Sequence, residues 1–204
     1  MTAQLALIDY GAGNLQSVAN AFRAIGVEPV VTADPEIVAT AERVVLPGVG
    51  AFAHCMGSLS AIDGMIEAME RAALERARPF LGICVGMQLL AGEGREHGVT
   101  PGLGWVPGSV DAIAPAPGLK VPHMGWNEVR VDGVHPVVGP GEAYFLHGYH
   151  FAAELPEQVH ALTDHGGAIV AAVGRDTIVG VQFHPEKSQA YGLLTLQRFM
   201  EWRP

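Results

Sequence analysis

The chain is poor in cysteine and in basic residues, and both scarcities exclude classes of protein. It has only two cysteines among 204 residues, Cys55 and Cys84, which are too few for the disulfide framework of a small secreted domain. Its 12 lysines and arginines are outnumbered by 21 acidic residues, so the net charge is −9, and they form no basic run. Binding to nucleic acid, which draws on clustered lysine and arginine, is therefore not expected.

Long apolar runs are also missing. No stretch approaches the roughly 20 apolar residues of a membrane span, and no basic and apolar leader precedes the first predicted strand. We therefore expect a cytoplasmic protein with no membrane segment. Hydrophobic residues make up 49% of the chain and charged residues 16%. Because no shift in composition divides it, we expect one domain over residues 1–204.

Hydrophobic periodicity predicts alternating strands and helices in the first half of the chain. The strands are predicted over residues 5–9, 29–32, 43–46 and just before Cys84, and the helices over 14–25, 35–40, 64–77 and 85–91. Shorter strands follow at 109–113, 126–131, 143–151, 159–163, 168–173 and 177–183, and a helix closes the chain at 189–202. The pattern favours an α/β fold, a three-layer flavodoxin-like sandwich with a mixed, mainly parallel sheet.

The sequence Gly-Ile-Cys-Val-Gly at 82–86, after an apolar run, is typical of a strand that turns sharply into a helix. The central residue of such a nucleophile elbow, here Cys84, has a strained backbone and an exposed side chain. Glycines at 82 and 86 remove side chains that would collide across the turn. The start of a helix also favours the thiolate form of cysteine. Although a lone cysteine is more often a small buried residue, this pattern predicts a nucleophile.

A second motif supplies the partners that a nucleophile needs. The apolar run 178–183 reads as a buried strand that Pro185 ends, so His184 lies at a strand end, where open α/β sheets build their sites. Glu186 can orient the imidazole. His-Pro-Glu alone could be an ordinary loop. Together with the elbow, it predicts a Cys84–His184–Glu186 triad for acyl transfer.

Other chemistries find less support. The turn Gly11-Ala12-Gly13 follows a strand, but position 16 is Gln16 where a dinucleotide fingerprint needs its third glycine. His147 and His150 have a spacing that could suit a metal, yet no third ligand cluster accompanies them. We expect neither a cofactor nor a metal. Cys55 is expected to be an ordinary buried residue on a helix.

The motifs Gly-Ile-Cys-Val-Gly-Met-Gln at 82–88 and His-Pro-Glu-Lys at 184–187 resemble those of the class I (triad) glutamine amidotransferases. Segments 9–15, 46–50, 122–127 and 145–149 resemble, within that class, the glutaminase subunits of imidazole glycerol phosphate synthase in histidine biosynthesis. The likeness covers nearly the whole chain. Gly148 departs from it, because the family more often has serine there, which affects a side-chain contact to glutamine.

This resemblance implies an activity and a partner. Glutamine would be hydrolysed to glutamate and ammonia, and the ammonia would pass to a (β/α)8-barrel cyclase subunit in a heterodimer. The joint products would be imidazole glycerol phosphate and an aminoimidazole carboxamide ribotide. The resemblance also places Asn14, Trp126 and Lys187 at the interface with the cyclase, although Trp126 could equally be a core residue and Lys187 a solvated charge.

The carbonyl oxygen that becomes charged during amide hydrolysis needs two donors. In a nucleophile elbow, one donor is the backbone N–H of the residue after the nucleophile, here Val85. The resemblance places the second donor in the loop after strand 43–46, which contains Gly48, Val49 and Gly50. Gly48 rotates freely whereas β-branched Val49 resists positive φ, so we expect this donor to point away at rest.

The remaining predicted residues contact glutamine. Gln88 lies one helical turn after Cys84 and faces the same side, where its amide could hold the α-amino or the carboxylate group. His147, Gly148 and Tyr149 would add contacts, mostly through their backbone.

Three alternatives stay open at this point. The glutaminase subunit of pyridoxal phosphate synthase has the same triad and a barrel partner, but its loop resembles Pro-Gly-Gly-Glu-Ser, whereas residues 47–50 are Pro-Gly-Val-Gly. A non-catalytic regulatory subunit could keep the same fold. A cysteine protease of the same elbow type is the weakest of the three.

Overall fold

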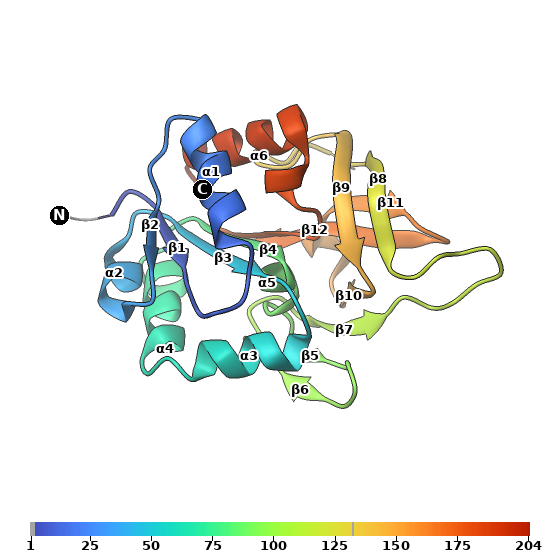
Figure 1. Cartoon of the computed structure of the whole chain (residues 1–204), viewed down its shortest axis with the longest axis horizontal. Helices are drawn as coiled ribbons and strands as arrows, with labels where there is room; N and C mark the ends of the chain where they lie inside the picture. Colours follow the sequence, from blue (N-terminus) through green and yellow to red (C-terminus); the bar gives the residue numbers. More distant parts are fainter. Residues whose placement is uncertain (1–2, 132) are drawn as a thin grey trace.

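The computed structural model describes residues 3–131 and 133–204, and its centre is a sheet of seven strands in the order β11-β12-β13-β4-β3-β1-β2. Helices α1 and α6 cover one face, and α2, α3 and α4 cover the other (Figure 1). The sheet is made of β1 (Ala6–Ile8), β2 (Val30–Thr32), β3 (Val44–Gly48), β4 (Phe80–Cys84), β11 (Val159–Asp164), β12 (Ala168–Arg175) and β13 (Ile178–Val181). The predicted three-layer α/β fold is confirmed.

The helices lie between the strands along the chain. They are α1 (Leu15–Ala24), α2 (Pro35–Thr40), α3 (Phe52–Ser60), α4 (Met65–Glu70), α5 (Val85–Gln88) and α6 (Gln189–Glu201), with a π-helical turn η1 (Arg71–Glu75) and 3-10 turns η2 (Pro156–Gln158) and η3 (Pro185–Lys187). No helix within the described residues is long and apolar enough to cross a membrane.

Five strands of the sheet are parallel. Strand β1 pairs in parallel with β2 and β3, β3 with β4, and β4 with β13. Strand β12 pairs antiparallel with β13 on one side and with β11 on the other. The parallel order β2-β1-β3-β4-β13 is that of a flavodoxin-like sheet, which binds ligands beyond the carboxyl ends of its strands. Every residue of β3 and of β4 is buried, as expected for strands covered by helices on both faces.

Local sequence explains where the helices begin. Helix α1 starts after Asn14, whose side-chain oxygen accepts from the Ser17 N–H at 3.4 Å. Helix α2 starts after Asp34, which accepts from the Glu36 N–H at 2.9 Å and is followed by Pro35 in the first helical position. Both caps satisfy N–H groups that the first helical turn leaves without intrahelical partners.

Two smaller sheets lie beside the main one. The first has the order β10-β7-β5-β6, with β5 (Glu93–Gly94), β6 (Thr100–Pro101), β7 (Gly108–Ala112) and β10 (Tyr149–Ala153). The second is an antiparallel ribbon of β8 (His123–Val129) and β9 (Gly141–His147). The predicted single strand 143–151 was wrong. The chain breaks at Gly148 because β9 pairs with β8 while β10 pairs with β7.

Two predicted helices also differ from the structure. The helix predicted over 64–77 is α-helical only as far as Glu70 and then widens into η1. The helix predicted over 85–91 ends as α5 at Gln88. Strands β5 and β6 have no counterpart among the predicted strands, because each spans only two residues, too few for a periodic pattern.

Glycines allow the elbow after β4 to lie directly against β3. A Cβ on Gly86 would overlap the backbone carbonyl of Leu46. A Cβ on Gly82 would lie 2.6 Å from the Gly86 carbonyl oxygen, and one on Gly48 would lie 2.6 Å from the Gly86 nitrogen. In each case the neighbour is backbone that cannot move aside as a flexible side chain could.

We therefore expect Gly86→Ala to lower the free energy of unfolding by at least about 3 kcal/mol, because the added methyl overpacks a fixed contact. Urea denaturation measures this loss. Gly57→Ala is the matched control: Gly57 is exposed on α3, and its Cβ would meet nothing within 4 Å. Alanine there is expected to stabilise the protein by about 0.5–1 kcal/mol. Equal effects of the two substitutions would contradict the packing argument.

Candidate active site

Cys84 occupies the elbow in a conformation that non-glycine residues rarely adopt. Its φ is 54° and its ψ is −111°, and α5 begins at the next residue. Such strained backbone costs about 1–3 kcal/mol and is concentrated at functional sites. The thiol was expected to be exposed, but the residue is only 3% exposed. The end of β9 covers it, since the Leu146 carbonyl lies 3.9 Å from Sγ.

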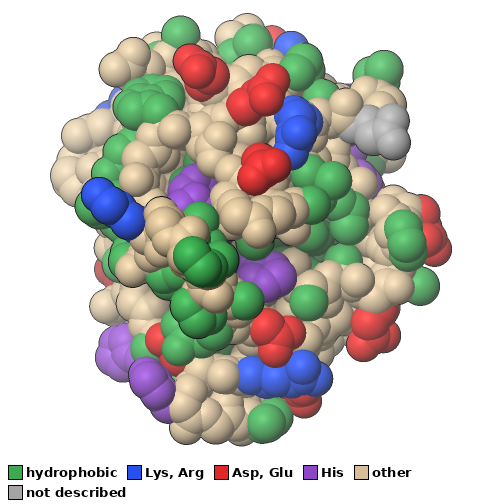
Figure 2. All heavy atoms as spheres, turned by 90° about the vertical axis from the view of Figure 1, so that its right-hand side faces the viewer, with side chains coloured by type: hydrophobic (Ala, Val, Ile, Leu, Met, Phe, Trp, Pro, Cys, Tyr) green, Lys and Arg blue, Asp and Glu red, His purple; other side chains and the backbone are tan. Residues whose placement is uncertain are grey.

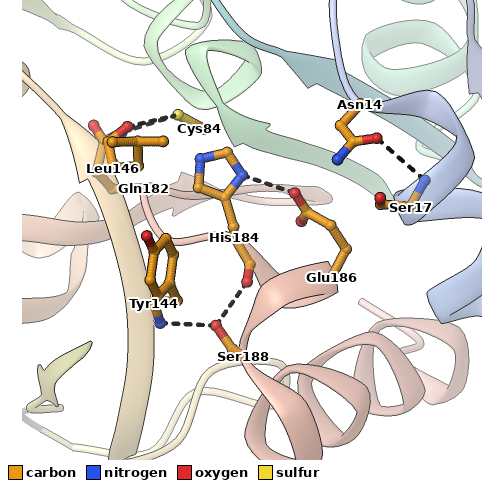
Figure 3. Close-up of polar contacts among 9 residues, drawn as sticks. All are labelled: Asn14, Ser17, Cys84, Tyr144, Leu146, Gln182, His184, Glu186 and Ser188. Carbon is orange, nitrogen blue, oxygen red and sulfur yellow. Dashed lines mark hydrogen bonds and ion pairs between the residues drawn. The ribbon is translucent and has the colours of Figure 1, made fainter. Parts of the chain in front are cut away.

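His184 and Glu186 form a buried pair beside this thiol. His184 Nδ1 lies 2.8 Å from Glu186 Oε1, and their side chains are 2% and 1% exposed. Figure 3 shows the imidazole between Cys84 and Glu186, with its Nδ1 directed at the carboxylate. The sequence motif and the fold thus bring all three predicted triad residues together.

The backbone around His184 is also held in place. Its N–H donates to the Tyr144 carbonyl at 2.9 Å, and its own carbonyl accepts from the Ser188 hydroxyl at 2.6 Å. The same hydroxyl accepts from the Tyr144 N–H at 2.9 Å (Figure 3). The imidazole is therefore oriented by contacts with β9 and η3 as well as by Glu186.

The electrostatics of His184 favour its protonated form. Burial alone would lower the pKa of the imidazole, but hydrogen bonds to Cys84 and Glu186, and the charges of both, raise that pKa to about 9. An imidazolium beside a sulfur atom is the arrangement that stabilises a thiolate.

A cavity of about 280 Å³ opens at Cys84. This volume suits a ligand the size of one amino acid, at the lower end of binding sites. Its walls are Val49, Gly50, Cys84, Val85, Gln88, Glu96, Pro122, Leu146, His147, Gly148, Tyr149 and His184. Of the predicted site residues, Gly48 does not line the cavity but is the strand neighbour of Cys84, and Glu186 lies behind His184. Asn14, Trp126 and Lys187 do not line it.

Gln88 uses its amide hydrogens within the protein. Its Nε2 donates to the Tyr149 carbonyl at 3.1 Å and to Gln182 Oε1 at 3.0 Å. The Nε2 of Gln182 in turn lies 3.7 Å from the Cys84 sulfur. Because a carbonyl can only accept, the Gln88 nitrogen must face Tyr149, and its Oε1 is left for a ligand.

Two histidines of the β8–β9 ribbon are linked by hydrogen bonds to the Tyr149 carbonyl, which Gln88 also contacts. Asn127 Nδ2 lies 3.1 Å from His123 Nε2, and His123 Nδ1 lies 3.0 Å from His147 Nε2. His147 Nδ1 lies 2.9 Å from the Tyr149 carbonyl. Since Asn127 donates and the carbonyl accepts, both imidazoles are neutral with the proton on Nδ1. This chain of hydrogen bonds orients the cavity wall at His147.

The other face of the ribbon is apolar and exposed. Met124 is 66% exposed, Trp126 48% and Leu146 37%. Met124 pairs with Leu146, and Trp126 with Tyr144, so all four lie on one face. The Lys187 ammonium lies 5.9 Å from the centre of the Tyr144 ring. Figure 2 shows the end of the molecule at which β8 and β9 lie in Figure 1, where apolar side chains lie among scattered basic and acidic ones.

Sequence reasoning missed some polar residues at the site. Gln182 directly follows β13, within the apolar run 178–183, and is fully buried; a lone amide in such a run was the available signal. Glu96 lines the cavity and accepts from the Phe52 N–H at 2.7 Å. Nothing in its local sequence indicates this, because it depends on a contact 44 residues away.

Comparison with known proteins agrees with this geometry. The family "Glutamine amidotransferase class-I" matches residues 6–200. Solved structures are similar at low identity: a glutamine amidotransferase has a TM-score of 0.77 at 19% identity over 98% of both chains. PurLQS of Thermotoga maritima has a TM-score of 0.74 at 18% identity over 98% of this chain and 99% of the other. The chain is a class I glutamine amidotransferase.

Curated relatives narrow the assignment. "Imidazole glycerol phosphate synthase subunit HisH" of Zymomonas mobilis is 59% identical over 208 residues, covering 100% of this chain and 98% of the relative. The HisH subunit of Rhodospirillum rubrum is 54% identical, covering 98% of this chain and 100% of the relative. Within its class, the chain belongs to the HisH family, the glutaminase subunits of imidazole glycerol phosphate synthase.

The buried histidines predict how stability depends on pH. Burial, reinforced by neighbouring histidines, lowers the pKa of His123 to about 4 and that of His147 to about 3. Unfolded histidine titrates near pH 6.5, so below that pH the unfolded chain binds protons that the folded chain does not. His184 acts oppositely, because its stabilisation is complete below pH 6.5 and is lost as the pH rises through about 9.

We therefore expect the free energy of unfolding to be greatest near pH 6.5 and to fall toward both pH 5 and pH 9.5, as measured by urea denaturation. His123→Gln should flatten the acid side of this profile. His54→Gln, at an exposed position of α3, should leave it unchanged. His147 still contributes to the slope in that variant, so only an acid slope as steep in His123→Gln as in the wild type would show that His123 does not contribute to it.

Proposed function

We propose that this chain hydrolyses glutamine at Cys84 and passes the ammonia to a cyclase partner. The observation that carries the proposal is the line of Cys84, His184 and Glu186, with the thiol at the wall of a cavity and the other two side chains buried behind it. The membership in the HisH family agrees with this reaction.

The reaction proceeds through a thioester. The Cys84 thiolate attacks the side-chain amide carbon of glutamine, and the protonated His184 gives its proton to the leaving ammonia. Neutral His184 then takes a proton from water, which attacks the thioester and releases glutamate. Glu186 holds the ring and stabilises each imidazolium that forms.

The oxyanion of each tetrahedral intermediate is stabilised by backbone N–H groups. One belongs to Val85 at the elbow, and the other to the loop of Gly48, Val49 and Gly50. The left-handed conformation in this loop falls on Gly50, with a φ of 110°, and not on β-branched Val49. This agrees with a resting loop whose Val49 N–H turns toward the oxyanion only after a peptide flip.

The amino-acid end of glutamine binds at the opposite wall. The free Oε1 of Gln88 and the carboxylate of Glu96 both face the cavity, and both are acceptors, so they suit the α-ammonium group. Of the two groups that Gln88 was predicted to hold, the ammonium therefore fits and the carboxylate does not. The backbone of His147, Gly148 and Tyr149 adds the remaining contacts. A Cβ on Gly148 would meet nothing closer than 3.9 Å, so the family's serine would fit.

The partner is a (β/α)8-barrel cyclase, docked on the exposed ribbon. Free ammonia becomes ammonium near neutral pH and loses its nucleophilicity, so it has to pass directly to an acceptor site. Met124, Trp126 and Leu146 form an apolar surface beside the cavity, and Lys187 extends it. Asn14 caps α1 at the same carboxyl edge of the sheet. Direct transfer of ammonia implies that the two chains form a heterodimer. A catalytic thiolate needs a reducing compartment, which suits the cytoplasm.

The direct test is Cys84→Ala in the complex with the cyclase. Alanine keeps the elbow but has no nucleophile, so glutamine-dependent product formation should fall to background. Ammonium salt at raised pH should restore product, because the synthase chemistry does not need this thiol. Glutaminase activity at the wild-type level in Cys84→Ala would refute the assignment of the nucleophile.

Glu186→Gln tests the role of the buried carboxylate. Removing its charge should lower the pKa of His184, because that charge helps to raise it. The basic limb of the kcat/KM profile for glutamine, where the imidazolium is lost, should therefore shift to lower pH by about one unit or more. Measuring the profile between pH 6 and pH 10 checks this, with Glu67→Gln at an exposed position of α4 as control. An unshifted limb would mean that Glu186 does not set the pKa of His184.

A further inference from the structure

Two buried side chains that the proposed mechanism does not use hold the loop of Gly48, Val49 and Gly50. The Tyr10 hydroxyl, at the end of the turn after β1, donates to the Pro47 carbonyl at 2.7 Å. The Cys55 thiol, on α3, lies 3.4 Å from the Val49 carbonyl and donates to it. Tyr10 is 5% exposed and Cys55 is 0% exposed, so water does not compete for these bonds.

The chemistry of both groups suits a permanent donor. Burial raises the pKa of the Tyr10 hydroxyl and that of the Cys55 thiol above their usual values, so both keep their proton at neutral pH. The two side chains also contact each other, which ties the β1 turn to α3 across the loop. The Tyr10 oxygen would lie 2.9 Å from a Cβ on Gly48, so it packs directly against the loop.

The two anchored carbonyls belong to the first and the third peptide of the loop. The Pro47 carbonyl is part of the peptide to Gly48, and the Val49 carbonyl is part of the peptide to Gly50. Between them lies a single peptide, Gly48–Val49, which bears the Val49 N–H. Anchors on both sides confine rotation to this central peptide and determine where its N–H comes to lie at the cavity wall.

We propose that Tyr10 and Cys55 are positioning residues of the oxyanion loop, which hold its outer peptides so that the Val49 N–H reaches the oxyanion. The proposal rests on the proposed function, since it assigns these residues to the hydrolysis at Cys84. Neither residue touches glutamine. Their effect falls on transition-state stabilisation rather than on substrate binding.

The test uses Tyr10→Phe in the full complex with the cyclase, because phenylalanine removes only the hydroxyl. We expect the glutaminase kcat to fall about 10-fold, which is less than the 10²–10³ that losing a whole oxyanion donor costs. The KM for glutamine should stay within about twofold, since uniform binding is untouched. Cys55→Ala should show the same division between kcat and KM, and it replaces Tyr10→Phe if that variant does not fold.

Tyr191→Phe is the matched control. The Tyr191 hydroxyl also donates to a backbone carbonyl, that of Gly139, at 2.7 Å, but away from the loop. Its loss should lower the melting temperature to a similar extent and leave kcat unchanged. A fall in kcat for both tyrosine variants would mean that lost stability, not the loop, reduces the rate, and would overturn the proposal.

A second measurement distinguishes an effect on the oxyanion loop from an effect on the triad. Iodoacetamide alkylates Cys84 through its thiolate and forms no oxyanion, so the alkylation rate, followed by peptide mapping, should be unchanged in Tyr10→Phe. A parallel fall in alkylation and kcat, an unchanged kcat, or a change confined to KM would each overturn the proposal. Failure of the proposed function looks different, because Cys84→Ala would then retain the activity of the wild-type complex.

Discussion

The contact between Gly86 and the Leu46 carbonyl is the constraint on which the site depends. It lets the first turn of α5 lie directly on β3, which places Cys84 beside the end of that strand. In register, Gly48 is the neighbour of Cys84. Cys84 and the loop of Gly48, Val49 and Gly50 are therefore joined by sheet pairing and not by flexible side chains. Ordering a glycine costs conformational entropy on folding. Only a glycine at position 86 allows Cys84 and the loop of residues 48–50 to lie this close, so the cost is unavoidable here.

The buried pair of His184 and Glu186 stabilises the fold less than its short distance suggests. Removing two charges from water is costly, and a buried ion pair seldom offsets that cost fully. Glu186 Oε2 has no hydrogen-bond partner among the described residues, although it is buried. Such a pair is best explained by its chemistry, because the charge of Glu186 keeps the neighbouring imidazole protonated in a site from which water is largely excluded.

Much of the fold and of the triad could be predicted, because the signals are local. The glycines around Cys84 encode a turn at the end of β4, and His184 follows three residues after the end of β13, so both residues lie at the carboxyl edge of one sheet. The chain's division into β9 and β10 at Gly148 could not be predicted, since it depends on which sheet each half joins. The contacts of Gln182 and Glu96 at the site could not be predicted either. They depend on partners 94 and 44 residues away, which no local pattern reveals.

The alternation of faces along the β8–β9 ribbon limits how sequences of this kind can diverge. One face carries His123 and His147 inward, where His147 lines the cavity, and the other carries Met124 and Trp126 outward. Inserting or deleting a single residue within either strand would exchange the two faces beyond that point. His147 would then leave the cavity wall at the same time as the exposed apolar surface disappeared. The cavity wall and this apolar surface therefore depend on the same register, and length variation is expected to accumulate outside the ribbon's strands.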